Sequence, residues 1–278
     1  MYSGGGSVAE HRFGATPPFT VGAEEEYMLL DPEGLELVQR VGPILAAEEG
    51  GEFGEYLSPE LFESVLEIHT AVCPDAVDLG RELRRLRAHI AEAAAAQQLV
   101  FAPAGTHPFS LFERQRITPR DRYRSIVQEL QYAARRELIF GLHVHAGVDG
   151  PDKAIAVVES LLPHLAELIA LSASSPFWRG ENTGIASSRQ LVFATMPRTG
   201  PPPRFASYEE YADVIGKLEA TGCLDDYTRI WWDIRPHPRL GTIEVRGHGR
   251  GLAPRGRDRA RRVRAGAREA IRGRVRQA

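Results

Sequence analysis

Three consecutive glutamates, Glu24 to Glu26, lie inside the stretch 21–30 (VGAEEEYMLL), which otherwise has the composition of a buried strand. Successive side chains of a strand point to opposite faces, so Glu24 and Glu26 share one face and Glu25 lies on the other. Two carboxylates on one face can bind a cation, share a proton or line an exposed edge. For this run alone an exposed edge is the commoner case, because buried unpaired charge is rare.

Two further stretches repeat the pattern of polar residues two positions apart. His143 and His145 share a strand face in 141–148 (GLHVHAGV), and Glu244 and Arg246 share one in 241–246 (GTIEVR). Alone, two satisfied or exposed histidines are as common as a metal site, and a strand with one wet face is ordinary. Together with the glutamate run, they predict a sheet with an apolar back and a front of carboxylates, imidazoles and a guanidinium.

The residue types on this front favour a hard divalent cation. Carboxylate-rich sites with one imidazole suit Mg²⁺ or Mn²⁺, whereas zinc sites use more nitrogen or sulfur. Such ions beside an arginine can hold a nucleoside triphosphate and stabilise a transferring phosphoryl group. The sequence has no G-x-x-x-x-G-K-[ST] motif and no Gly-rich kinase loop. If ATP is bound, metal ions must therefore hold its phosphates.

Composition limits the class of protein. With 278 residues, 43% of them hydrophobic and 26% charged, the chain resembles a soluble globular protein of one large domain or two small ones. From the sequence alone, no apolar run is expected to be long enough for a bilayer and residues 1–18 lack a signal-peptide core, so a cytoplasmic protein without a membrane partner is expected. Cys73 and Cys223 form no disulfide framework and are expected to be inert.

The order of elements predicts an α+β fold, with a mainly antiparallel sheet flanked by helices. Strands are expected at 19–30, 35–39, 66–72, 99–106, 139–148, 228–234 and 242–246, and helices at 75–98, 119–136, 152–172 and 207–221. Pro163 should kink the third of these helices. Glu60, Glu63 and Glu67 lie near one stripe if their segment is helical, but on differing faces if it is a strand.

Five stretches resemble, in this order, the bacterial carboxylate–amine ligases of the glutamate–cysteine ligase type 2 family. They are 22–27 (GAEEEY), 60–70 (ELFESVLEIHT), 141–148 (GLHVHAGV), 171–180 (LSASSPFWRG) and 232–246 (WDIRPHPRLGTIEVR). The resemblance implies a glutamine-synthetase-like catalytic domain over 19–246. It also implies that ATP activates a carboxylate, glutamate or a similar one, as an acyl phosphate, and that cysteine or another amine then displaces the phosphate.

The resemblance implies roles for individual residues. The Mg²⁺ or Mn²⁺ ligands would be Glu24, Glu26, Glu60, Glu67, His143 and Glu244. His145 would meet phosphate or substrate, and Arg246 would steady the phosphate as charge develops, so both would serve catalysis and ATP binding. Arg235 would join the ATP-binding groups or reach a substrate carboxylate, with a structural role as the alternative. Glu25 would make a salt bridge or face water behind the sheet.

Other residues in these stretches have weaker assignments. Ser174, Arg179 and Arg189 lie in segments similar to the family's substrate-side loops, and a role in loop packing or surface pairing is equally open. Trp231 and Trp232 are expected in the core rather than against adenine.

The C-terminal residues 247–278 contain 11 arginines and two acids, a local charge of +9 against −12 for the rest of the chain. Such a tail usually indicates nucleic acid or an anionic surface. The resemblance ends at Arg246, however, and Lys153 and Lys217 are the only lysines, as in a GC-rich gene. We therefore expect a frameshifted or truncated homologue with a poorly ordered tail, a flexible arm at 1–18 and no nucleic-acid partner.

Two alternatives to the ligase stay open on the sequence alone. A metal-dependent hydrolase using His143 and His145 would work without ATP and prefer zinc. A catalytically impaired homologue would bind only nucleotide or a partner protein. A homodimer is also left open.

Overall fold

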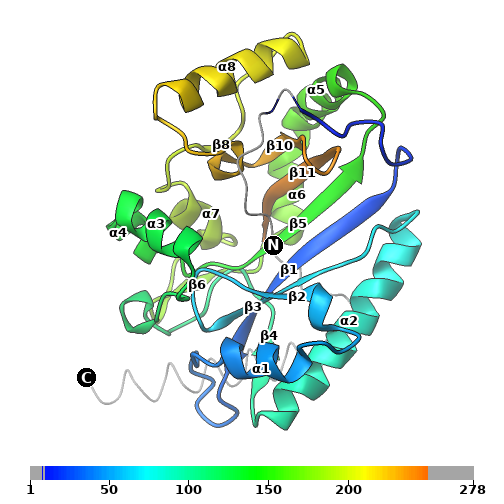
Figure 1. Cartoon of the computed structure of the whole chain (residues 1–278). Coiled ribbons are helices and arrows are strands. Elements are labelled where there is room, and N and C mark those ends of the chain that lie inside the picture. Colours follow the sequence, from blue (N-terminus) through cyan, green and yellow to red (C-terminus); the bar gives the residue numbers. More distant parts are fainter. Residues whose placement is uncertain (1–7, 9, 250–278) are drawn as a thin grey trace.

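The computed structural model describes Val8 and residues 10–249. Within this part of the chain a seven-stranded antiparallel sheet forms the centre, with helices around it (Figure 1). The strand order is β10-β11-β5-β1-β3-β2, and β4 also pairs with β1. The strands are β1 (Val21–Leu30), β2 (Leu57–Pro59), β3 (Val65–His69), β4 (Val100–Ala102), β5 (Gly141–Gly147), β10 (Ile234–His237) and β11 (Thr242–Gly249). The predicted α+β class with a mainly antiparallel sheet is confirmed.

Helices form in the four predicted regions, mostly with shorter bounds, and also at 41–48 and 188–193, where none was predicted. The helices are α1 (Val41–Glu48), α2 (Ala76–Ala96), α3 (Asp121–Leu130), α4 (Tyr132–Arg135), α5 (Pro151–Leu161), α6 (Leu165–Ser172), α7 (Ser188–Phe193) and α8 (Tyr208–Ala220). Two small sheets pair β6 (Phe177–Trp178) with β7 (Glu181–Asn182), and β8 (Thr199–Gly200) with β9 (Trp231–Trp232). Asp75 caps the long α2, because its side chain accepts hydrogen bonds from the amides of Val77 and Asp78.

The apolar back of the sheet is covered in two halves. The half around β1 and β3 packs against α1 and α2, where Ile68 of β3 meets Leu86 and Ile90 of α2 in one buried cluster. The half around β10 and β11 packs against α5 and α8, with Ile243 and Ile215 in a second buried cluster. The helices α3, α4 and α7 lie together on the other flank of the molecule (Figure 1), where their apolar residues share a further cluster. The front of the sheet thus faces α3 and α7 across the space that holds the site described below.

The apolar segment Pro151–Ser172 bends where Pro163 predicts it. A 3-10 turn over Leu162–His164 separates α5 from α6. By length and composition alone this segment could cross a membrane, so the prediction that no run was long enough is wrong on that count. Its buried residues pack against the sheet and α8, so the segment covers one face of the sheet.

Two predicted strands differ from the structure, and the alternatives left open for residues 58–70 are decided. Residues 228–234 form no single strand, because a 3-10 turn over Tyr227–Arg229 precedes the short β9. Residues 35–39 form no strand beyond a single bridge between Leu30 and Leu37, because the carboxylate of Asp31 accepts from the amides of Gly34 and Glu36 and holds the segment as a turn. Residues 58–70 are not helical; they form β2, a turn and β3. Glu60 and Glu67 are therefore brought together by the sheet and the turn rather than by a helix stripe.

The chain before β1 contacts the body of the protein where it is described. Val8 and Phe13 are buried in the cluster with Ile243. The Arg12 amide donates to Pro238 O at 2.9 Å. Gly241 has a φ of +68°, and a Cβ atom at this position would collide with the carbonyl oxygen of Arg12, so the contact requires glycine. Residues 250–278, most of the predicted tail, lie outside the described residues.

Candidate metal and nucleotide site

The strand register places the predicted site residues on one face of the sheet. Residues directly opposite in antiparallel strands point to the same side. Glu24 lies opposite His143 of β5, and Glu26 lies opposite Glu67 of β3. On the other side of β5, Glu244 of β11 lies opposite both His145 and Arg235 of β10. The predicted front of carboxylates, imidazoles and guanidinium groups is therefore formed by β1, β3, β5, β10 and β11.

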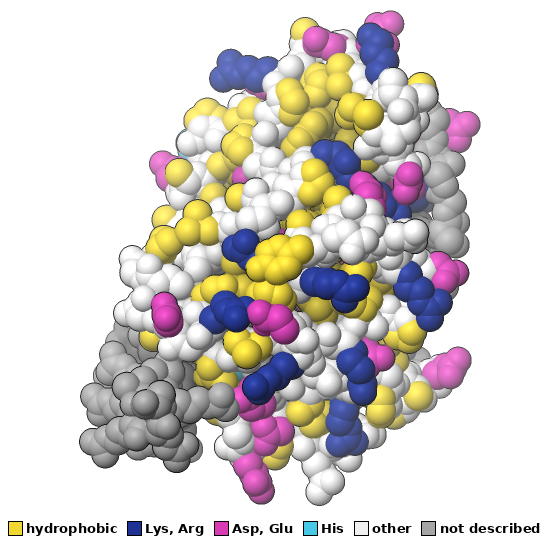
Figure 2. Space-filling model, turned by 90° about the vertical axis from the view of Figure 1, so that its left-hand side faces the viewer, with side chains coloured by type: hydrophobic (Ala, Val, Ile, Leu, Met, Phe, Trp, Pro, Cys, Tyr) yellow, Lys and Arg dark blue, Asp and Glu magenta, His cyan; other side chains and the backbone are white. Residues whose placement is uncertain are grey.

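This front forms one wall of a cavity of about 690 Å³. Most of the predicted site residues line it, namely Glu24, Glu26, Glu60, Glu67, His143, Arg235 and Arg246. The remainder of the lining includes an apolar group, which comprises Leu61, Ile126, Ile139, Phe193, Met196 and Trp231. The molecular surface on the flank that carries α3, α4 and α7 mixes basic side chains with hydrophobic ones (Figure 2). The cavity thus offers polar contacts for charged groups and apolar contacts for an uncharged ring or chain.

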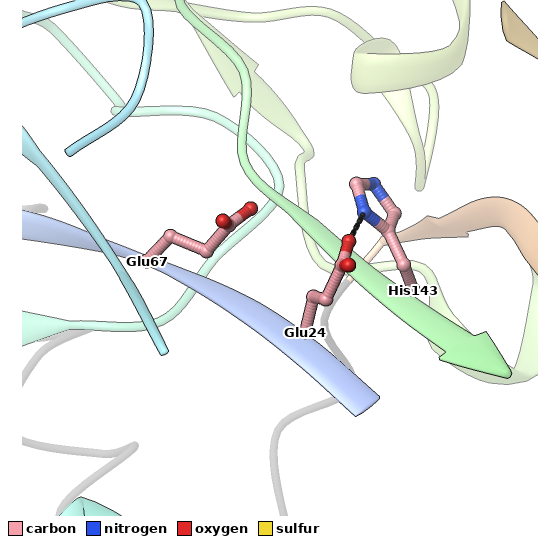
Figure 3. Close-up of side chains that lie close together, drawn as sticks. All are labelled: Glu24, Glu67 and His143. Carbon is pink, nitrogen blue, oxygen red and sulfur yellow. Dashed lines mark hydrogen bonds and ion pairs between the residues drawn. The ribbon is translucent and has the colours of Figure 1, made fainter. Parts of the chain in front are cut away.

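Glu24 is the centre of the polar wall. Its Oε2 lies 2.9 Å from Nδ1 of His143 (Figure 3), and its Oε1 lies 3.5 Å from Nε2 of His145. Burial raises the pKa of Glu24, but hydrogen bonding and charge from His143 and His145 outweigh it and hold this pKa well below its usual range. Glu24 is therefore an ionised carboxylate with ring nitrogens beside it, as a cation ligand requires.

Glu26, Glu60 and Glu67 bring three carboxylates close together. Oxygen atoms of the three lie within 4.8 Å of one another. Burial and the negative charge of Glu26 raise the pKa of Glu60 to about 7, and burial with the charges of Glu24, Glu60 and Glu26 raises the pKa of Glu67 well above its usual range. A divalent cation between them would offset this repulsion.

Glu244 is held from both sides by arginines. Nε of Arg235 donates to its Oε2 at 2.7 Å, and Nη1 of Arg246 donates to its other oxygen. Burial opposes ionisation, but Arg235 and Arg246 hold the pKa of Glu244 well below its usual range. Arg235 also donates to the carbonyl of Thr228 at 3.1 Å, so its guanidinium is engaged with protein acceptors. This arrangement favours Arg235 as the residue that positions Glu244.

The donor set fits magnesium or manganese. Three overlapping groups each bring together ligand atoms within 4.8 Å: Glu24 with Glu67 and His143, Glu24 with His145 and Glu244, and Glu26 with Glu60 and Glu67. Carboxylate oxygens dominate them, as Mg²⁺ and Mn²⁺ prefer, and no cysteine takes part. All six predicted metal ligands lie in these groups, and Glu63 lies apart, in an ion pair with Arg116.

Glu25 lies behind the sheet, as the alternation predicts. It is fully buried and pairs with Arg87 of α2, whose Nε lies 2.9 Å from Oε2 of Glu25. The hydroxyl of Tyr27 donates to the same oxygen at 2.6 Å. The salt bridge predicted as one of two options for Glu25 is therefore present.

The family follows from comparison with known proteins. A model described as glutamate–cysteine ligase family 2 (GCS2) matches residues 20–257. The chain belongs to this family. "Putative glutamate--cysteine ligase 2-3" of Rubrobacter xylanophilus is 45% identical over 237 residues, which cover 85% of this chain and 65% of that protein. "Putative glutamate--cysteine ligase 2" of Herpetosiphon aurantiacus is 44% identical over 230 residues, which cover 82% of this chain and 59% of that protein.

This GCS2 chain thus spans about three fifths of the length of the curated relatives it matches. Among solved structures, a bifunctional glutathione synthetase from Pasteurella multocida matches with a TM-score of 0.65 at 15% identity, over 83% of this chain and 35% of that chain. Glutamate–cysteine ligase from Francisella tularensis, solved in complex with AMP, matches with a TM-score of 0.58 at 15% identity, over 83% of this chain and 61% of that chain. At this identity the likeness shows the fold.

The residues with weaker assignments separate in the structure. Arg189 is buried and lines the cavity. Arg179 instead forms an ion pair with Glu113 at 2.6 Å, and the hydroxyl of Ser174 accepts from the Gly105 amide at 3.1 Å. Trp231 is buried and also lines the cavity, although we expected only a core role.

Glu137 and Tyr123 line the cavity of this GCS2 chain and were missed from the sequence. Glu137 follows two arginines after α4, and Tyr123 lies on α3; neither has a partner at a spacing that indicates chemistry. For Glu137 no local signal existed, because its position depends on how the connection from α4 to β5 crosses the front of the sheet.

Proposed function

We propose that this chain is the catalytic part of an ATP-dependent carboxylate–amine ligase, with glutamate as the carboxylate and cysteine as the amine. Its membership of the GCS2 family and the names of its relatives support a ligase of this type. The proposal includes ATP as the nucleotide, Mg²⁺ or Mn²⁺ as the ions, glutamate and cysteine as the two substrates, and a cytoplasmic location. The observation that carries it is the cluster of five carboxylates and two imidazoles on the front of the sheet, most of which line the cavity, with Arg246 beside it.

This geometry supports the proposed residue roles. Glu24, Glu26, Glu60, Glu67, His143 and Glu244 would hold divalent ions, which when bound neutralise phosphate oxygens and orient them for transfer. Arg246 lines the cavity and contacts Glu244 through Nη1, while its Nε has no hydrogen-bond partner among the described residues, so its guanidinium would be available to steady phosphate charge. Arg235 keeps Glu244 in position.

His145 has a different environment from His143. Its Nδ1 lies 3.0 Å from the hydroxyl of Thr242 and its Nε2 lies 3.5 Å from Glu24. Burial lowers the pKa of His145, but contact with Glu24 and the charge of Glu244 raise it above its usual value. We assign His145 to phosphate or substrate contact, because a protonated imidazole at this place adds positive charge to the wall.

The proposed reaction has two steps. A carboxylate oxygen of glutamate attacks the γ-phosphorus of ATP, which gives an acyl phosphate and releases ADP. The amine nitrogen then attacks the acyl carbon, the carbon–oxygen bond to phosphate breaks, inorganic phosphate leaves and the amine loses a proton to solvent. Each step needs charge stabilisation and positioning rather than a covalent group of the protein.

The test is ADP release by the purified 278-residue chain with ATP, Mg²⁺ and glutamate, with and without cysteine, compared with Glu24→Gln. Cysteine-stimulated release that disappears in the variant is the expected result. Release without an amine requirement would point to an ATPase, and amide hydrolysis without ATP that prefers zinc would point to a hydrolase. Folded protein that binds Mg²⁺·ATP but releases no ADP would indicate a homologue that only binds nucleotide and is not a ligase.

A further inference from the structure

One ligand of the proposed metal cluster lies outside the paired strands. Glu26 of β1 and Glu67 of β3 lie directly opposite each other, so the hydrogen bonds between these strands fix their places. Glu60 instead follows the last residue of β2 and begins the connection to β3. Oxygen atoms of all three carboxylates nevertheless lie within 4.8 Å of one another. Because like charges at this distance repel, a contact other than strand pairing must hold Glu60 in the cluster.

The carboxylate of Glu60 is oriented by its own backbone. Glu26 accepts a hydrogen bond at 2.7 Å from the amide of Gly141, which belongs to β5. Glu60 instead accepts one at 2.6 Å from the amide of the next residue, Leu61. The direction of the Glu60 carboxylate therefore depends on how the peptide groups around Leu61 are held.

Thr118 holds these peptide groups from outside the sheet. Its hydroxyl donates to the carbonyl of Glu60, and its amide donates to the carbonyl of Leu61 at 2.9 Å. The preceding carbonyl, of Pro59, accepts from the hydroxyl of Tyr123 at 2.8 Å. Thr118 is 5% exposed and is not one of the described residues that line the cavity, so it can affect a ligand there only through the residues it holds.

The two residues before Thr118 continue the same contact. Ile117 pairs with Phe62 in an isolated bridge, and the amide of Glu63 donates to the carbonyl of Arg116 at 3.0 Å. The side chains of this last pair also meet, since Nε of Arg116 lies 2.6 Å from Oε2 of Glu63. This short segment thus pairs with the turn as a strand would, and satisfies backbone groups that the sheet leaves without partners.

We propose that Thr118 is a positioning residue that holds Glu60 in the metal cluster through the carbonyls of Glu60 and Leu61. The inference rests on the proposed function, because the cluster is its metal site, and it adds a residue that no ligand would touch. In the alternative, Thr118 only closes a turn. The two cases differ in whether loss of its hydroxyl lowers the affinity for a metal ion or lowers stability alone.

The test is calorimetric titration of Mn²⁺ into the purified 278-residue chain without nucleotide. Thr118→Val keeps the shape of the side chain but leaves the Glu60 carbonyl without its donor. The affinity for the ion that Glu60 helps to hold should fall by about 10-fold, as for other groups that orient metal ligands. Thr118→Ser keeps the hydroxyl and should restore most of this affinity.

Thr106→Val is the matched control. Thr106 is buried, its hydroxyl donates to the carbonyl of Phe177 at 2.7 Å, and it is outside the described lining of the cavity. The control therefore loses the same kind of hydrogen bond as Thr118→Val. It should lower the melting temperature in a similar way but keep the wild-type affinity for Mn²⁺.

A double variant shows whether Thr118 acts through Glu60. Glu60→Gln alone should weaken Mn²⁺ binding, and adding Thr118→Val to it should cause no further loss, since the charge that Thr118 positions is already gone. ADP release gives a separate readout. Thr118→Val should need about 10-fold more Mg²⁺ for half-maximal release and should approach the wild-type rate when Mg²⁺ saturates, which a general loss of structure would not allow.

Several results would overturn the inference. Wild-type Mn²⁺ affinity in folded Thr118→Val contradicts it, and so does an equal loss of affinity in Thr106→Val. A full further loss in the Glu60→Gln background shows that Thr118 does not act through Glu60. If Thr118→Val fails to fold, as its melting temperature would show, Thr118→Ala replaces it, because alanine leaves room for water at the carbonyl.

Failure of the proposed function gives a different pattern. Wild-type protein that binds no Mn²⁺ removes the metal site and, with it, both proposals. Mn²⁺ binding without ADP release contradicts the ligase alone, and the affinities of the Thr118 variants then still decide the inference.

Discussion

The two faces of β1 treat the same residue type in opposite ways. On the back, Glu25 is fully buried, but Arg87 and the hydroxyl of Tyr27 complete its carboxylate. On the front, Glu26 shares its surroundings with Glu60 and Glu67, and no arginine forms an ion pair with these three among the described residues. The buried carboxylate on the back face is thus paired within the protein, whereas the carboxylates on the front face carry negative charge that no arginine ion pair offsets among the described residues.

This difference separates structure from function within three consecutive residues. A paired buried carboxylate specifies how α2 docks on the sheet, whereas crowded carboxylates cost stability unless a cation joins them. The raised pKa values of Glu60 and Glu67 are the sign of that cost. Substitutions on the front should therefore change ligand binding and activity, and substitutions on the back should change folding.

The largest effect is expected from Glu24→Gln. This change keeps the shape of the side chain but removes the charge that lies between His143 and Glu67. We expect ADP release to fall on the order of 10³-fold, since a bound metal ion supplies several kcal/mol of charge stabilisation, while the unfolding midpoint stays near that of wild type. Initial rates and urea unfolding measure the two quantities, and an active variant would remove Glu24 from the site.

Arg87→Met tests the back of the sheet. It leaves the carboxylate of Glu25 buried without its cation, so the free energy of unfolding should fall by about 3 kcal/mol. The double variant Arg87→Met with Glu25→Met should recover much of this loss, and Arg81→Met on the exposed side of the same helix should change stability little. Chemical denaturation gives these values. The folded fraction of Arg87→Met should release ADP at the wild-type rate; a rate defect as large as that of Glu24→Gln would contradict the separation of the two faces.

Mg²⁺ should stabilise the folded chain by joining the front carboxylates. At about 100 times its dissociation constant, a ligand that binds only the folded state adds about 2.7 kcal/mol to the free energy of unfolding. We expect EDTA to remove this gain. In Glu67→Gln the metal-free protein should be more stable than wild type, because the cost of burying this acid among Glu24, Glu60 and Glu26 is gone, and the Mg²⁺ effect should shrink. Equal Mg²⁺ stabilisation in both proteins would place the ion elsewhere. Melting curves with Mg²⁺ and with EDTA distinguish these cases.

The polar front could be predicted from the sequence because alternation in a strand is strictly local. Glu24 and Glu26 share a face whatever the rest of the chain does, and the same holds for His143 and His145. Three such strands, together with the family resemblance, were enough for the fold class and for the set of polar side chains that share the front of the sheet. The turn at Asp31 was missed, since its side-chain hydrogen bonds compete with the strand pattern of 35–39.

Long-range positions could not be predicted in this way. The helical stripe considered for Glu60 and Glu67 was wrong because a turn between β2 and β3 brings them together. Glu137 and Arg189 reach the cavity from segments about 50 residues apart, and neither has a regular polar neighbour that indicates a site. Arg235 was expected to meet ATP or substrate, and only the register of β10 with β11 shows that it faces Glu244.

The smallest effect, counted per pH unit, is expected in a pH dependence that compares two buried acids, Glu25 with a partner and Glu137, whose Oε1 has no hydrogen-bond partner among the described residues. The pKa of Glu137 is raised from 4.5 to about 8 in the folded protein, chiefly by burial. Between these values the folded state holds a proton that the unfolded state has lost, so the contribution of Glu137 to stability is fully present below pH 4.5 and is lost as the pH rises toward 8. The slope from one such group is at most about 1.4 kcal/mol per pH unit.

Glu137→Gln should remove this slope, while Glu82→Gln on α2, away from the cavity, should keep it. Urea unfolding of wild type, Glu137→Gln and Glu82→Gln from pH 5 to pH 8 measures the free energy of unfolding. Subtracting one curve from another removes the titration of the carboxylates that the proteins share. Identical curves for wild type and Glu137→Gln would mean that Glu137 is already compensated, and the contrast between the two acids would disappear.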